Sequence, residues 1–173
     1  FRVSEPLWRL LASRAFGPPG WVIKLPVIAQ AALCVALAAL LARRLSGPKV
    51  GLLTGLVRAL SFPFFIHLDR FILDYLVLAG MLGGTLLIAR CARGGGYRDA
   101  MLAGVPIGLA LLAKPFFPLL ALPLGAAWLC VVGRWRQGMV VMTAGLFLAL
   151  LIAAPWHFSM LNGPYGDFFR SQY

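Results

Sequence analysis

Residues 22–42 read VIKLPVIAQAALCVALAALLA, and this stretch decides the fold. Its 21 residues hold a single charged side chain, Lys24, close to the start. A helix needs about 20 predominantly apolar residues to cross the hydrocarbon core of a bilayer. The stretch therefore predicts a transmembrane helix.

Five further apolar segments follow along the chain. They are Val50–Ile66, Phe71–Ala89, Met101–Ala113, Phe116–Val132 and Met139–Pro155. The segment Met101–Ala113 is short, and only Lys114 and Pro115 separate it from the next one. We interpret these two as spans, with a re-entrant hairpin as the alternative, because irregular backbone is tolerated at membrane depth where protein covers it. The predicted fold is all-α, a polytopic membrane bundle of about six transmembrane helices.

Three regions are predicted along the chain. Residues 1–20 form an outer-side juxtamembrane segment, residues 21–155 the transmembrane bundle, and residues 156–173 an outer-side interfacial segment. In the first region, the stretch Pro6–Phe16 places apolar side chains on one helical face and Arg9 and Arg14 elsewhere. This pattern is typical of an amphipathic helix that lies on a membrane surface.

The composition supports the bilayer as solvent. Hydrophobic residues make up 61% of the chain and charged residues 12%, about half the charged share of a soluble domain. The formal net charge is +11. We do not expect nucleic acid as a partner, because the basic residues lie in short gaps between apolar segments and form no basic face.

The charges also predict an orientation. Eight of the 16 Lys and Arg residues lie in the three loops that join segments one to two, three to four, and five to six. Four of the five acidic residues lie on the opposite side. Positive loops face the cytoplasm. The other side of the bundle is therefore predicted to be the outer side.

A cluster of ionisable residues precedes and enters the third segment. The stretch from His67 to Tyr75 reads HLDRFILDY. Asp74 lies inside the predicted span, where a carboxylate is costly and by default indicates function, so we take it as the candidate catalytic residue. Arg70 is four residues away and shares its helical face if the helix begins there. For His67 and Asp69, positions at the interface and pairing at a helix end are an alternative interpretation.

Two cations in or between apolar segments are candidate phosphate ligands. Lys114 lies at the junction of the fourth and fifth segments, where its ammonium can contact a lipid phosphate as a point charge. Arg58 lies near the middle of the second segment. The alternatives are a snorkelling lysine at a hairpin tip and an arginine paired inside the bundle.

His157 follows Pro155 and Trp156 on the outer side. Together with His67 and Asp69 it is a candidate acceptor or metal ligand. The sequence identifies no certain cofactor. A divalent metal ion stays an open alternative, because two histidines without close spacing are weak evidence for one.

Four stretches resemble membrane glycosyltransferases that use polyprenyl-phosphate sugars, with the GT-C fold. The resemblance is to the group of protein O-mannosyltransferases and lipid A aminoarabinose transferases. In chain order the stretches are Lys24–Pro26 with Leu41–Gly47 (LARRLSG), Phe62–Asp74, Gly108–Pro115 (GLALLAKP), and Ala154–His157 (APWH) followed by Gly163–Phe169 (GPYGDFF). Their order and spacing cover nearly the whole chain.

The resemblance implies transfer of a sugar from a polyprenyl-phosphate carrier to a glycan, lipid or protein acceptor at the outer face of the membrane. In a bacterium this is the periplasmic face of the inner membrane. Asp74 matches an acidic position near the acceptor or a bound metal, and Lys114 matches a lysine near the carrier phosphate. Arg70 and Arg58 are further candidate phosphate ligands.

The chain also departs from the family. The family's first outer loop, which carries an acidic base, precedes the stretch seen here, and Glu5-Pro6 matches only its later part. We therefore expect a fragment that is inactive alone. The alternative function is a transporter or permease fragment in which Asp74, Arg58 and Lys114 line a pathway. A structural membrane subunit without a site is a third possibility.

Overall fold

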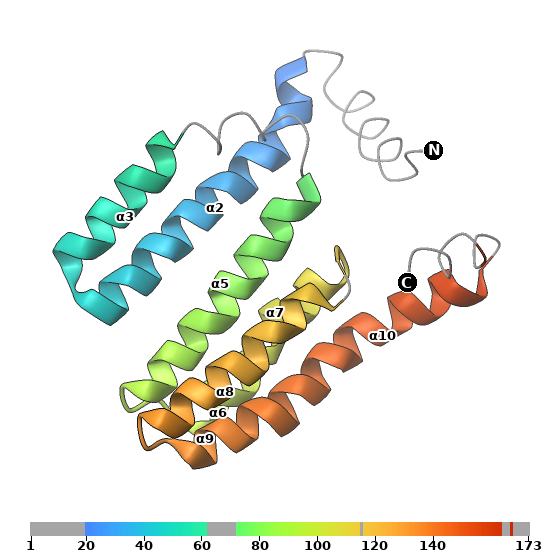
Figure 1. Cartoon of the computed structure of the whole chain (residues 1–173). Helices are drawn as coiled ribbons and strands as arrows, with labels where there is room; N and C mark the ends of the chain where they lie inside the picture. Colours follow the sequence, from blue (N-terminus) through green and yellow to red (C-terminus); the bar gives the residue numbers. More distant parts are fainter. Residues whose placement is uncertain (1–19, 62–71, 115, 164–166, 168–173) are drawn as a thin grey trace.

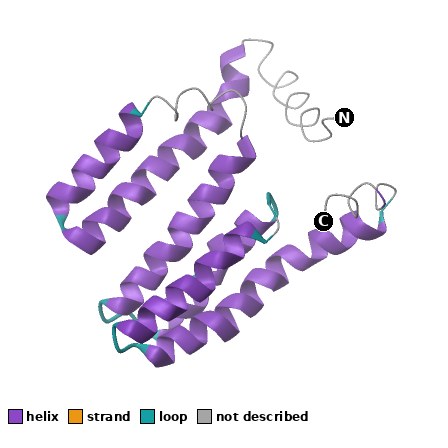
Figure 2. Cartoon of the chain, in the orientation of Figure 1, coloured by secondary structure: helices purple, strands orange, loops and turns teal. Residues whose placement is uncertain are grey.

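The computed structural model describes residues 20–61, 72–114, 116–163 and 167. Within these residues the regular structure is entirely helical (Figure 2). The elements are α2 (Gly20–Ser46), α3 (Pro48–Leu60), α5 (Ile72–Ala92), α6 (Tyr97–Leu102), α7 (Gly104–Leu111), the 3-10 helix η2 (Phe117–Leu120), α8 (Ala121–Val131), α9 (Trp135–Val140), the π-helix η3 (Val141–Gly145) and α10 (Leu146–Asn162). The predicted all-α fold is confirmed. The predicted juxtamembrane helix lies outside the described residues.

Three described stretches of helix are long and apolar enough to cross a membrane. They are Leu25–Ser46, Asp74–Ala92 and Trp135–Asn162. They correspond to the first, third and sixth predicted segments. The second segment contains the 13-residue helix α3, which at 1.5 Å per residue extends about 20 Å. The polytopic membrane bundle is thus built around three long helices, with shorter ones packed beside them.

The last helix extends past the predicted end of its segment. It passes through Pro155 and ends at Asn162, so Trp156 and His157 are helical. Proline removes one backbone N–H, but membrane helices tolerate this when neighbouring groups satisfy the released carbonyl. The interfacial segment predicted from residue 156 therefore starts with two more turns of α10.

The short fourth segment forms α6 and α7, an arm that runs antiparallel to α5. Helices α6 and α7 are separated by Ala103 alone and lie along α5 (Figure 1). A turn with Gly95 joins this arm to the end of α5, and at its other end Lys114 reaches Asp74 at the start of α5. The arm therefore follows α5 from end to end. Two spans in the fourth and fifth segments stay a prediction, because neither segment is among the three described stretches that are long and apolar enough to cross a membrane.

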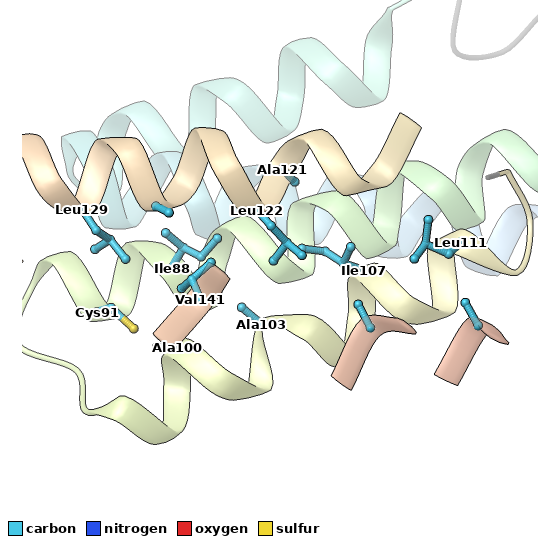
Figure 3. Packing of buried hydrophobic residues seen from close by; sticks show 13 residues of the cluster. Ile88, Cys91, Ala100, Ala103, Ile107, Leu111, Ala121, Leu122, Leu129 and Val141 are labelled. Atoms are coloured by element: carbon cyan, nitrogen blue, oxygen red, sulfur yellow. The ribbon is translucent and has the colours of Figure 1, made fainter. Parts of the chain in front are cut away.

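Buried apolar side chains form two clusters. The larger one joins α5 to α6–α10, and Figure 3 shows Ile88, Ile107 and Leu122 meeting at its centre. The smaller one joins α2 to the start of α5. There the buried Cys34 thiol donates a hydrogen bond to the Tyr75 carbonyl at 3.2 Å.

Glycines allow α7 to lie unusually close to both of its neighbours. A Cβ on Gly80 of α5 would overlap the carbonyl oxygen of Pro106, and one on Gly104 would overlap that of Gly145. A Cβ on Gly108 would lie 2.9 Å from the carbonyl oxygen of Ala149 in α10. Lipid tails are as apolar as leucine, so burying apolar side chains between helices does not favour helix association in a membrane. Helices there usually associate through small residues that allow close contact.

The helices bring charged loops to one end of the bundle. In Figure 1 the α2–α3, α5–α6 and α8–α9 connections lie together at the lower left. We call this the basic end, and its charged side chains are Arg43, Arg44, Lys49, Arg90, Arg93, Arg98, Asp99, Arg134 and Arg136. The start of α5 and the end of α7 lie at the opposite end, which we call the Asp74 end.

We predict that Gly104→Ala destabilises the protein. Alanine ordinarily favours a helix interior by about 1 kcal/mol over glycine. Here its methyl group would displace the backbone of η3, and overpacking of this kind costs about 1–3 kcal/mol. The expected result is a lower thermal midpoint of the purified protein in detergent.

The matched control for this substitution is Gly96→Ala. Gly96 has a negative φ, and the nearest atom to an added Cβ there is 4.0 Å away. Gly96 is the N-cap of α6, where alanine costs up to about 1 kcal/mol, so we expect a smaller fall in its midpoint than for Gly104→Ala. Equal midpoints for the two variants would contradict the close approach of α7.

Candidate functional site

Asp74 lies in the first turn of α5, at the Asp74 end of the bundle. The unpaired N–H groups of a first helical turn carry partial positive charge, which favours a carboxylate there. The side chain of Asp74 is 39% exposed. A polar residue placed this way keeps access to the surface although it lies within an apolar helix.

Lys114 lies in the turn after α7 and forms an ion pair with Asp74, between Nζ and Oδ1. Backbone hydrogen bonds from Ala113 and Lys114 to the Ala110 carbonyl, at 3.1 and 3.2 Å, fix this turn. The lysine side chain is 51% exposed. Two candidate residues that are 40 positions apart in the sequence thus meet in space.

The backbone beyond Lys114 is strained. Phe116 has φ 66° and ψ −51°, and among the described residues it is the non-glycine with a positive φ. Such a conformation costs about 1–3 kcal/mol and persists only where the surroundings impose it. The strained backbone at Phe116 therefore indicates that the surrounding structure fixes the shape of this turn, two residues from Lys114.

His157 fixes the end of α7 from the neighbouring helix. Its Nε2 lies 2.9 Å from the carbonyl oxygen of Leu111. A carbonyl only accepts, so Nε2 carries the proton. The bond satisfies one of the carbonyls that every helix leaves unpaired at its C-terminus. His157 is thereby tied to the chain three residues before Lys114.

Arg58 lies in the last turn of α3, not in the middle of a span as predicted. The described helix ends at Leu60, and Ser61 donates to the Arg58 carbonyl through Oγ at 2.9 Å. The residue is half-buried, and its charge is close enough to Cys34 and Tyr75 to act on both electrostatically. Arg58 therefore lies near Tyr75 at the start of α5, and Tyr75 directly follows Asp74 in the sequence.

The remaining candidates, His67, Asp69 and Arg70, lie outside the described residues. Among the described residues no group of three or more His, Cys, Asp and Glu side chains is placed to hold a metal ion. The predicted metal site, which includes His67 and Asp69, stays a prediction. Ligation through Nε2 of His157 would require its bond to Leu111 to break.

The sequence did not reveal the tie between His157 and Leu111. A bond to a backbone carbonyl leaves no residue-type signal, because every residue offers the same acceptor. The direct contact between Asp74 and Lys114 was not predicted either, although each residue was singled out by its charge within an apolar sequence.

Residues 8–158 match the family of dolichyl-phosphate-mannose-protein mannosyltransferases. The chain belongs to this family. The match covers the described helices up to residue 158, within α10, and it confirms the resemblance to GT-C glycosyltransferases drawn from the four short stretches. In this mannosyltransferase family member, the Asp74–Lys114 pair lies within the matched region. No protein of curated function and no solved structure matches the chain.

We predict that Asp74→Asn and Lys114→Gln each change stability by at most about 1 kcal/mol. Both side chains of the pair are more than a third exposed, and exposed pairs contribute about 0–1 kcal/mol because water screens them. Thermal unfolding of the two variants in detergent measures this. A loss of several kcal/mol in either variant would contradict it and would indicate a structural pair.

Proposed function

We propose that this mannosyltransferase family member transfers a sugar from a polyprenyl-phosphate carrier to an acceptor hydroxyl, and that Asp74 and Lys114 form part of its active site. The observation that carries the proposal is the ion pair itself. It joins a carboxylate and an ammonium at one end of an apolar bundle, with both side chains accessible. These are the two charges that such a transfer requires.

Lys114 is proposed to bind the phosphate of the carrier. When the bond between the sugar and the phosphate breaks, negative charge grows on the leaving phosphate. A preorganised cation stabilises that charge because it is already in place and needs no reorganisation when the bond breaks. The half-exposed ammonium of Lys114 is accessible to a lipid phosphate, and Arg58 and Arg70 are proposed to add further positive charge.

Asp74 is proposed to accept the proton of the attacking hydroxyl. The carboxylate is held by Lys114 in this structure. A carrier phosphate competes with Asp74 for the same ammonium, so its arrival releases the carboxylate beside the bond that is broken. General base catalysis by a positioned carboxylate accelerates a reaction by about 10²–10⁴-fold.

We further propose that the Asp74 end faces the outside, which in a bacterium is the periplasmic face of the inner membrane. The opposite end holds eight basic side chains and one acidic one, Asp99. Short cytoplasmic loops are the ones that carry such an excess. A lipid, glycan or protein acceptor on the outer face then meets the carrier phosphate at the same boundary.

A transporter is less well supported than a transferase. In a transport pathway, charged groups line a route through the membrane. Here Asp74 pairs with Lys114 at one end of the described bundle, and the family is one of sugar transferases. The transferase is therefore the function proposed.

We predict that Asp74→Asn in the full-length protein lowers kcat for sugar transfer by about 10²–10⁴-fold, the contribution of a general base. We expect Lys114→Gln to be defective as well, and Lys114→Arg to retain part of the activity because it keeps the charge. Transfer from a polyprenyl-phosphate sugar in membranes measures these rates.

The matched control is Asp99→Asn. Asp99 also lies in the first turn of a helix, but at the basic end. We expect it to transfer sugar at the normal rate. Near-normal transfer by Asp74→Asn would remove Asp74 from the active site, and equal losses in both variants would indicate a general effect on the fold.

A further inference from the structure

A cavity lies at the basic end, far from the Asp74–Lys114 pair. Its volume is about 370 Å³, and it is lined by Leu40, Arg43, Arg44 and Arg93. The first three residues come from the end of α2, and Arg93 follows the end of α5. Three arginine side chains and one leucine, from the end of α2 and from the turn after α5, thus line one hollow, and among the described residues its lining includes no carboxylate.

A hydrogen bond holds the two walls of the cavity together. The Nη2 group of Arg93 donates to the carbonyl oxygen of Leu45 at 2.9 Å. A guanidinium has five N–H donors, so this bond leaves others for a ligand. On the opposite wall, the base of Arg43 is packed against α3, because a Cβ on Gly51 would lie 2.6 Å from the Arg43 Cβ.

The two helices beside the cavity carry exposed leucines. Leu40, which lines the cavity, is 45% exposed. Leu33 on the same helix α2, and Leu52, Leu53 and Leu56 on α3, are between 50% and 68% exposed. A ligand with both an anionic group and hydrocarbon chains matches this arrangement, since arginine forks bind phosphate oxygens and the leucines contact acyl chains.

We propose that this cavity binds the phosphate headgroup of an anionic phospholipid, in the leaflet that faces the basic end. The three arginines hold the phosphate, and the exposed leucines of α2 and α3 contact the acyl chains. Basic pockets between membrane helices bind anionic headgroups in this way. The site is separate from the proposed sugar transfer and does not depend on it.

Native mass spectrometry of the purified protein, equilibrated with mixed phosphatidylglycerol and phosphatidylcholine, tests the proposal. The unmodified protein is expected to retain phosphatidylglycerol in preference to phosphatidylcholine. Each arginine near a membrane surface contributes about fivefold to binding of anionic lipid. Arg93→Gln and Arg44→Gln are each expected to lower the preference by about that factor.

Arg44→Gln guards against a misfolded variant, because within the described residues the Arg44 side chain makes no hydrogen bond or ion pair. The control is Arg98→Gln, which removes the same charge from the same end but does not line the cavity. It is expected to keep the full preference. Unchanged preference in both cavity variants, or an equal loss in the control, would overturn the site.

A competition experiment distinguishes a site for a phospholipid from a site for free phosphate. Inorganic phosphate at the same concentration as phosphatidylglycerol is expected to leave the bound lipid in place, because it cannot contact the leucines. Complete displacement of the lipid by inorganic phosphate would overturn the proposal of a phospholipid site.

Discussion

The close approach of α7 to α5 and α10 is the constraint on which the rest of the structure depends. Backbone meets backbone where Gly80 faces Pro106 and where Gly104 faces Gly145. In a membrane, apolar side chains gain little by leaving lipid for protein, so helices associate by close van der Waals contact and by bonds between polar groups. The glycines supply the first and the bond between His157 and Leu111 supplies the second.

This packing sets the register of α7 along α5, and the register brings Lys114 to Asp74. A shift of one helical turn moves Lys114 by about 5.4 Å along α5, beyond the range of an ion pair. The π-helix η3 ends at Gly145, the residue that Gly104 approaches. The π-helical turn in the last long helix thus lies where α7 makes its closest contact with that helix.

The two ends of the bundle differ in chemistry for a physical reason. Basic residues gather in the short connections at one end of the bundle, whose positions Figure 1 shows. The described ion pair of the site joins the start of α5 to the turn after α7, at the other end. An ammonium beside a carboxylate forms a pair with no net charge, so the free energy needed to place the two groups at a membrane boundary is small. The three arginines that line the hollow have no carboxylate among its lining residues, which is why we propose that they bind an anion from outside the chain.

Much of the fold was predictable from hydrophobicity alone. The run at residues 22–42 and its counterparts predicted helices, and charges within apolar sequence singled out Asp74 and Lys114. Their contact was not predictable, because it depends on glycine packing between segments 40 residues apart. Arg58 was expected near the middle of its segment, but it lies in the last turn of α3, which ends at Leu60 where Ser61 binds the Arg58 carbonyl. The continuation of α10 through Pro155 was missed because proline usually ends helices in water.

The role of the Asp74–Lys114 pair is tested most directly by a cryo-electron microscopy structure of the full-length protein, determined with and without a polyprenyl-phosphate donor. Without donor we expect an ion pair between Lys114 and Asp74. With donor, Lys114 should contact the phosphate and Asp74 should face the sugar. A donor phosphate bound away from Lys114, with the ion pair intact in both structures, would contradict this role.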